Sequence, residues 1–197
     1  MRFKKTLYAA LALITITLSS TLADVAAHAD PVFVDGPPDT GAHTWCVPAS
    51  PAVTLHDIAD DSMRRARDQT TMTRAYHDTC NGATDVKWLW AFEPNDPYYG
   101  MAVCVNWYEN HRCNRYEITL NKSNIDTWTY PGSQLRKTAC HELGHTLGVS
   151  HYKFSEYPGG DTSHSCMRSF EVPSPNKSWH ITYGNHHVKS HINPWFS

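Results

Sequence analysis

The chain has 197 residues, of which 41% are hydrophobic and 18% are charged, and its formal net charge is −2. This length suits one domain with a sizeable core and leaves little room for a second domain. The near balance of charge gives no electrostatic basis for binding nucleic acid, so we expect no nucleic-acid partner.

Residues 1–29 have the features of a secretory signal peptide. Three basic residues precede an apolar stretch over residues 7–18, which is too short to span a membrane. Ala27-His28-Ala29 offers a small-residue cleavage site, which predicts a mature domain over residues 30–197. We therefore expect a secreted, extracellular protein without a membrane span after signal removal; the alternative is a membrane anchor that is retained.

The mature part begins with a Pro- and Gly-rich segment, residues 30–53, which predicts an extended arm with little helix. A loose apolar stripe predicts a helix over residues 56–76. Alternating large apolar residues predict a strand over residues 85–92, and further strands are expected over residues 101–107 and 115–120. One well-buried face of the first of these strands would carry Val86, Trp88, Trp90 and Phe92. The tryptophans expected in the core are Trp88, Trp90 and Trp107.

A second long helix is predicted over residues 134–147. Leu143 and Leu147 are four residues apart in it and would face the core. A last helix is expected over residues 179–192, although Gly184 and several β-branched residues oppose it. The order of helix, strands and helix predicts an α+β fold.

One segment, H-E-L-G-H-T-L-G-V-S-H, has the spacing of a catalytic zinc site. His141 and His145 would point from the same face of the second helix, and Gly148 could end that helix and turn His151 toward the same metal. Three protein ligands leave a fourth position for water, and Glu142 is free to act on that water. A helical His-x-x-x-His pair often occurs by chance, but the added Glu, Gly and His in register favour a metal site.

This segment resembles the signature of the metzincin zinc peptidases, H-E-x-x-H-x-x-G-x-x-H followed by a Met-turn. Met167, within residues 165–168, stands where the resemblance places the Met-turn that supports the histidine ligands. The region over residues 137–167 is most similar to matrixin-type catalytic domains. Tyr152 replaces the Ser that matrixins commonly carry, and Ser169 replaces the Tyr of astacin-like enzymes, so the subfamily stays open.

The resemblance implies a metzincin-like zincin fold with a mixed β-sheet, an active-site helix and a small C-terminal subdomain. It implies a monomeric zinc metalloendopeptidase that hydrolyses peptide bonds in proteins or peptides. Zinc-bound water would be activated by Glu142, and the extended substrate would pair with an edge strand, expected near residues 101–107. The alternatives are a zinc peptidase with a narrow substrate and a catalytically silent zinc-containing binding module.

All six cysteines lie in the mature part, which indicates disulfides in an exported chain; free or metal-binding thiols are the alternative. Six cysteines allow fifteen connectivities. Local geometry favours Cys104–Cys113 and Cys140–Cys166, which leaves Cys46 with Cys80. The second of these pairs would tie the start of the zinc helix to the Met-turn.

We expect one catalytic Zn²⁺ ion. A histidine cluster near the C-terminus raises the alternative of a second metal site, but hydrogen-bonded or solvated histidines are favoured. The cluster consists of His164, His180, His186, His187 and His191. A structural Ca²⁺ ion at Asp161, beside Gly159 and Gly160, is unsupported because Ca²⁺ takes about six to eight oxygen ligands.

Overall fold

A computed structural model describes most of the chain from residue 38 onward. The described residues are 38, 41–48, 53–109, 111–151, 165–168, 172, 174–175 and 178–197. The expected signal peptide, the segment with Asp161, Gly159 and Gly160, and His164 lie outside them. Within the described part of the chain, no helix has the length and apolar character needed to cross a membrane.

The centre of the fold is a five-stranded mixed β-sheet with the strand order β2-β1-β3-β5-β4. The strands are β1 (His43–Cys46), β2 (Arg74–Tyr76), β3 (Val86–Ala91), β4 (Gly100–Trp107) and β5 (Cys113–Asn121). The pairs β1–β2, β1–β3 and β3–β5 are parallel, whereas β4 pairs antiparallel with β5 and forms one edge. The α+β class and the mixed sheet are therefore confirmed.

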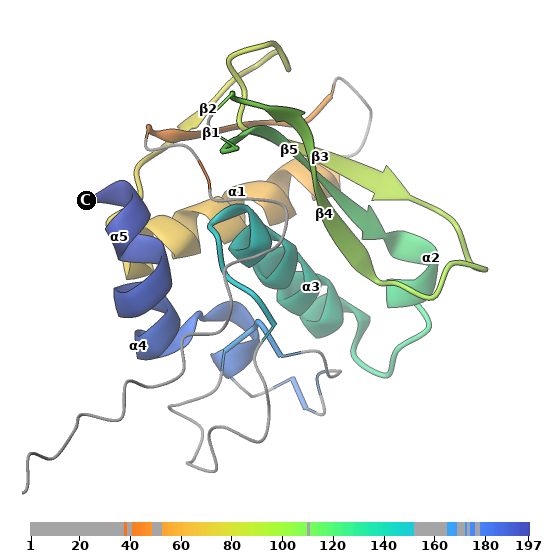
Figure 1. Ribbon diagram of the computed structural model, residues 1–197. Helices are drawn as coiled ribbons and strands as arrows, with labels where there is room; N and C mark the ends of the chain where they lie inside the picture. The colour runs from red at the N-terminus through yellow and green to blue at the C-terminus, as the bar shows by residue number, and fades with distance from the viewer. Residues whose placement is uncertain are drawn as a thin grey trace, which may run out of the picture.

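Two long helices, α1 (Val53–Gln69) and α3 (Pro131–Thr146), lie on the same side of the sheet and contact each other (Figure 1). Between them and the sheet lies the hydrophobic core. Its fully buried members include Met63 of α1, Trp88 of β3 and Leu143 of α3. Leu147, expected to face the core with Leu143, is also fully buried. A short helix, α2 (Lys122–Ile125), follows β5.

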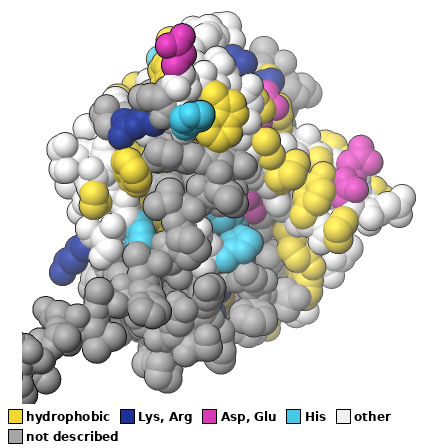
Figure 2. Space-filling model, viewed as in Figure 1, with side chains coloured by type: hydrophobic (Ala, Val, Ile, Leu, Met, Phe, Trp, Pro, Cys, Tyr) yellow, Lys and Arg dark blue, Asp and Glu magenta, His cyan; other side chains and the backbone are white. Residues whose placement is uncertain are grey.

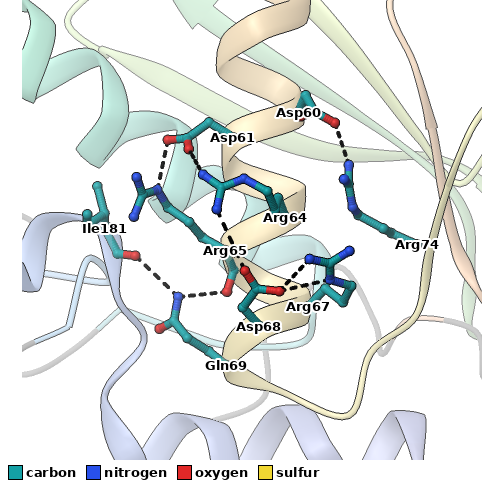
Figure 3. A network of polar contacts seen from close by, with 9 residues as sticks. All are labelled: Asp60, Asp61, Arg64, Arg65, Arg67, Asp68, Gln69, Arg74 and Ile181. Atoms are coloured by element: carbon teal, nitrogen blue, oxygen red, sulfur yellow. Dashed lines mark hydrogen bonds and ion pairs between the residues drawn. The ribbon is translucent and has the colours of Figure 1, made fainter.

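The outer side of α1 carries a network of charged residues (Figure 3). Asp61 accepts a hydrogen bond from Arg65 at 2.8 Å, and Arg64 pairs with the same carboxylate. Asp68 lies 3.7 Å from Arg64. These i,i+3 and i,i+4 pairs stabilise the helix modestly, because exposed ion pairs contribute little in water.

The helix expected over residues 56–76 is wrong beyond Gln69. Met72 is buried in the core, and Arg74–Tyr76 forms β2 at the edge next to β1. Parallel pairing with β1 satisfies the backbone of this segment, which outweighs its loose helical pattern. The segment expected to be an extended arm likewise supplies β1, which lies inside the sheet.

Two aromatic predictions are also wrong. Trp107 is 46% exposed and Phe92 is 64% exposed, whereas Trp88 is fully buried and Trp90 packs partly buried against the core. Trp107 ends the edge strand β4 after two irregularities in its register, and Phe92 follows the last residue of β3. Neither position has a second layer of structure over it, which the period-2 pattern of the sequence does not reveal.

The continuous helix expected over residues 179–192 is replaced by shorter pieces. A 3-10 turn over Ser178–Ile181 (η3) is followed by α4 (Gly184–His187), a π-helical turn over Val188–Ile192 (η4) and α5 (Asn193–Phe196). Gly184 has a φ of 65°, a left-handed conformation that separates η3 from the helical residues after it. The expected helix is therefore interrupted at Gly184, a residue with low helix propensity.

Three disulfides use all six cysteines, Cys46–Cys80, Cys104–Cys113 and Cys140–Cys166. These are the three expected pairs. The first joins β1 to the loop after β2, and the second joins the edge strand β4 to β5. The third joins α3 to the turn that carries Met167 and so links the two parts of the candidate site.

Candidate metal centre

The three histidines of the motif meet at the C-terminal half of α3. The ring centroids of His141 and His145 are 4.8 Å apart, and each lies 4.9 Å from the ring of His151. Gly148, with a φ of 84°, reverses the chain after α3 and brings His151 back. Each ring offers one ligand atom, and these atoms lie within 4.8 Å of one another. Among the described residues, no other group of His, Cys, Asp or Glu meets this criterion.

Backbone carbonyls orient the two helical imidazoles. Nδ1 of His141 lies 2.8 Å from the carbonyl oxygen of Cys166, and Nδ1 of His145 lies 2.8 Å from that of Val149. A carbonyl oxygen only accepts, so Nδ1 of each neutral ring donates and Nε2 keeps its lone pair. This is the tautomer that a metal-binding histidine adopts when a second group fixes its ring.

The environment keeps the imidazoles neutral. Burial lowers the pKa of His141 well below its ordinary value and lowers that of His145 to about 4. Burial also lowers the pKa of His151, and the positive charge of Lys137 acts in the same direction. Neutral imidazoles bind a metal ion without first losing a proton, so these three histidines could hold a metal ion.

Glu142 is buried between α3 and the edge strand β4. Burial raises the pKa of its carboxyl group to about 8, while the charge of Lys137 and a hydrogen bond from the backbone N–H of Ala102 oppose the shift. A carboxyl group with a pKa near neutrality can both take up and release a proton at physiological pH.

Gly100 allows β4 to lie against the side chain of Glu142, because glycine has no Cβ atom. A Cβ atom at this position would lie 2.6 Å from Cγ2 of Thr138 and 2.8 Å from Cγ of Glu142. Sequence reasoning missed this residue; its only signal was a glycine beside a predicted strand, which often marks a close approach of the backbone.

These residues line a cleft of about 420 Å³. Its walls come from the segment that enters β4 and from α3. The lining residues include Tyr98, Tyr99, Gly100, Met101, Lys137 and Thr138, together with Glu142 and the three histidines. Figure 2 shows histidine side chains reaching the surface near the middle of this face, with hydrophobic side chains on the side of the sheet. The cleft thus combines the candidate metal ligands with an edge strand.

Met167 lies against α3, in the turn where it was expected. It is fully buried, and a Cβ atom on Gly144 would come within 2.2 Å of its sulfur. Oγ of Ser165 accepts a hydrogen bond from the backbone N–H of Met167 at 3.2 Å and lies 3.0 Å from Nδ1 of His187. Gly144 and Ser165 were not singled out from the sequence, because their role depends on a contact across the fold.

His43 is a further buried histidine that sequence reasoning missed. Its Nε2 lies 2.9 Å from Oγ1 of Thr146, whose hydroxyl donates to the carbonyl of Leu143. His43 Nε2 therefore carries the proton of this bond, and burial lowers the pKa of the ring to about 3. The contact joins β1 to the last residue of α3, next to His145.

Those C-terminal histidines whose side chains the structure describes do not assemble into a comparable group. His187 is hydrogen-bonded to Ser165, and its ring centroid lies 5.9 Å from that of His191. His180, His187 and His191 are all buried. Within the described part of the chain, they do not form a cluster with metal-ligand spacing.

No model of a known protein family matches the chain, and no curated protein is similar to it in sequence. The assignment of a function therefore depends on the residues of the site and on their geometry.

Proposed function

We propose that the protein is a secreted zinc-dependent metalloendopeptidase with a metzincin-type active site of matrixin-like character. The observation that carries this proposal is the convergence of three neutral imidazoles beside a buried carboxyl group in one cleft. His141, His145 and His151 would hold one zinc ion through their ring nitrogens. When bound, zinc would act as a Lewis acid toward water and toward the peptide carbonyl.

Glu142 is the proposed general base and acid. Its carboxylate would accept a proton from the attacking water and then deliver that proton to the leaving amine. Burial supports both roles, because it raises the pKa of the carboxyl group to about 8, within reach of physiological pH. A purely structural metal site would have no use for a carboxyl group held in this position.

The edge strand β4 is the proposed binding surface for the substrate backbone. Gly100, Met101 and Ala102 line the cleft, and among the described strands β4 has a neighbour on one side alone. An extended peptide could add to the other side by backbone hydrogen bonds, which gives affinity with little dependence on sequence. This agrees with the endopeptidase activity that we propose.

The proposed extracellular location has a physical basis in the covalent structure. All six cysteines form disulfides, which persist in oxidising compartments and are rare in the cytosol. The amino-terminal signal segment and this disulfide content are together the basis for proposing secretion.

The test compares the purified protein with Glu142→Gln, both loaded with zinc, on unfolded casein and a mixed peptide library. We expect internal cleavage by the wild type and a loss of turnover of about 10²–10⁴-fold in the variant, with zinc binding retained. The glutamine has nearly the same shape but cannot accept the proton.

Full activity in zinc-loaded Glu142→Gln would contradict the role of this residue. Cleavage of a few library peptides, with casein left intact, would favour a narrow-substrate peptidase. Bound zinc without any cleavage by the wild type would favour a binding module.

A further inference from the structure

The last residue of α1 lies far from the metal ligands in sequence but is joined to them by a short series of hydrogen bonds. We propose that Gln69 is a positioning residue for the metal centre, acting through residues 181–183 and the turn at Cys166 on the ring of His141. This inference rests on the proposed metal site. It assigns a function to a side chain that contacts neither the metal ligands nor the cleft lining.

The carboxamide of Gln69 uses both of its ends. Its Nε2 donates to the carbonyl oxygens of Arg65 at 2.8 Å and Ile181 at 3.3 Å, and its Oε1 accepts from the backbone N–H of Tyr183 at 3.0 Å. Figure 3 shows this side chain reaching from α1 to Ile181. Because two partners are acceptors and one is a donor, the amide fits in one orientation. Gln69 therefore fixes the backbone on both sides of Thr182.

Thr182 passes this restraint to the turn below α3. The carbonyl oxygen of Thr182 accepts a hydrogen bond from the backbone N–H of Cys166 at 2.7 Å. The hydroxyl of Tyr183 donates to the carbonyl of Cys140 at 3.0 Å. Residues 182 and 183 thus hold both half-cystines of the disulfide that joins α3 to the Met167 turn.

The final contact reaches a metal ligand. The carbonyl oxygen of Cys166 accepts the hydrogen bond from Nδ1 of His141 at 2.8 Å, which sets the orientation of that ring. A shift of Thr182 would move Cys166. The ring of His141 would then rotate, or its hydrogen bond to the carbonyl of Cys166 would weaken. Outer groups that orient a metal-bound histidine typically contribute about 10–100-fold to metal affinity.

Tyr183 makes this route stiff. Its side chain is fully buried, and its ring lies close to Gly144, where a Cβ atom would come within 3.0 Å of Cε1. The phenol ring cannot shift without disturbing α3 between Glu142 and His145. A displacement of the backbone at Tyr183 would therefore move α3 near the metal ligands, because the buried side chain of Tyr183 has no space in which to adjust.

The test measures metal binding to the purified protein by competition with a chromophoric chelator and records the visible absorption of the cobalt-substituted form. Gln69→Leu removes the three hydrogen bonds. We expect its zinc affinity to fall about 10-fold and its cobalt spectrum to shift. Gln69→Glu keeps an acceptor for Tyr183 but places a carboxylate oxygen against the carbonyls of Arg65 and Ile181, so a loss of zinc affinity is expected here too. This variant serves if the leucine variant does not fold.

Thr70→Val is the matched control. It removes the hydrogen bond that the Thr70 hydroxyl donates to the carbonyl of Ala66 and the one that it accepts from the backbone N–H of Met72. Both lie at the same helix end, and neither involves residues 181–183. We expect lower thermal stability but zinc affinity within about twofold of the wild type, because lower stability does not weaken binding to a protein that stays folded.

Wild-type zinc affinity and an unchanged cobalt spectrum in both folded Gln69 variants would overturn the proposal and leave Gln69 with a purely structural role. A wild type that binds zinc but cleaves nothing would contradict the peptidase function alone. The proposal for Gln69 would remain testable, because its test measures zinc affinity and the cobalt spectrum and does not use peptide cleavage. A wild type that binds neither zinc nor cobalt would overturn both.

Discussion

Burial favours the neutral form of Glu142 and of the histidines at the site, because a charged group loses the solvation of water. It raises the pKa of Glu142 and lowers the pKa values of His141 and His145. The metal-free protein therefore holds a protonated carboxyl group beside unprotonated imidazoles at neutral pH. For the three histidines this is the state ready to bind a metal ion.

The Glu142 carboxyl group should make the metal-free protein less stable as pH rises. The unfolded chain releases this proton near the ordinary value of 4.5, whereas the folded chain keeps it until about pH 8. The folded state therefore binds more protons across that window, and stability falls with increasing pH. Glu142→Gln removes this dependence, so its stability advantage should grow from pH 5 to pH 8 by an amount on the order of a few kcal/mol.

Urea unfolding of the metal-free wild type and variant at both pH values measures this difference. Effects of the histidines are common to both proteins and cancel. Glu93→Gln, at an exposed position, provides the control. A stability difference for Glu142→Gln that is the same at both pH values would mean that the carboxyl group titrates normally.

At the scale of elements, the site lies where three pieces of the fold meet: α3, the edge strand β4 and the turn at Met167. Two of these contacts need a glycine. Side-chain atoms of Thr138 and Glu142 occupy the space of a Cβ atom at Gly100, and the sulfur of Met167 occupies that space at Gly144. The disulfide between Cys140 and Cys166 also joins α3 to the turn at Met167.

Gly100→Ala should lower turnover without loss of zinc. The added methyl group would overlap Thr138 and Glu142, so β4 or the carboxyl group must move, while the imidazoles keep their contacts. A misplacement of about 1 Å can cost about 10²-fold in rate. Peptide cleavage and zinc content of the variant are the measurements.

Gly82→Ala is the control, since a Cβ atom there meets nothing within 4 Å. Wild-type turnover in Gly100→Ala would show that the close approach of β4 is not needed for catalysis.

Removal of the Cys140–Cys166 disulfide should weaken both the fold and the metal site. Replacing both cysteines with alanine releases a cross-link between residues 26 apart, which typically lowers the free energy of unfolding by about 3 kcal/mol. Zinc affinity should fall as well, because Cys166 carries the carbonyl that orients His141. Chemical denaturation and chelator competition measure the two effects.

The matching variant removes Cys104–Cys113, whose residues are 9 apart between β4 and β5. It should lose somewhat less stability, because the loop is shorter, and keep its zinc affinity. Equal zinc affinity in the two double variants would contradict the link between this disulfide and the metal centre.

At the scale of the whole molecule, the sequence predicted the features that depend on residues close together in the chain. The spacing of His141, His145 and His151, with Gly148 between them, brought the three rings together as expected. The period-2 pattern located β3, and the helical pattern located most of α3.

The sequence did not predict contacts between distant segments. The approach of Gly100 to Glu142 and the hydrogen bonds of Gln69 join elements whose packing no local pattern specifies. The helix ended at Gln69 because pairing of Arg74–Tyr76 with β1 satisfied the following backbone. Trp107 is exposed because it ends an edge strand, a place that depends on the order of the whole sheet.

The most direct measurement is the metal content of the purified protein together with its proteolytic activity before and after treatment with phenanthroline, a zinc chelator. We predict about one zinc ion per chain, loss of casein cleavage when zinc is removed, and recovery when zinc is restored. Casein cleavage that persists in protein shown to contain no metal would contradict the account, as would a protein that binds no zinc at all.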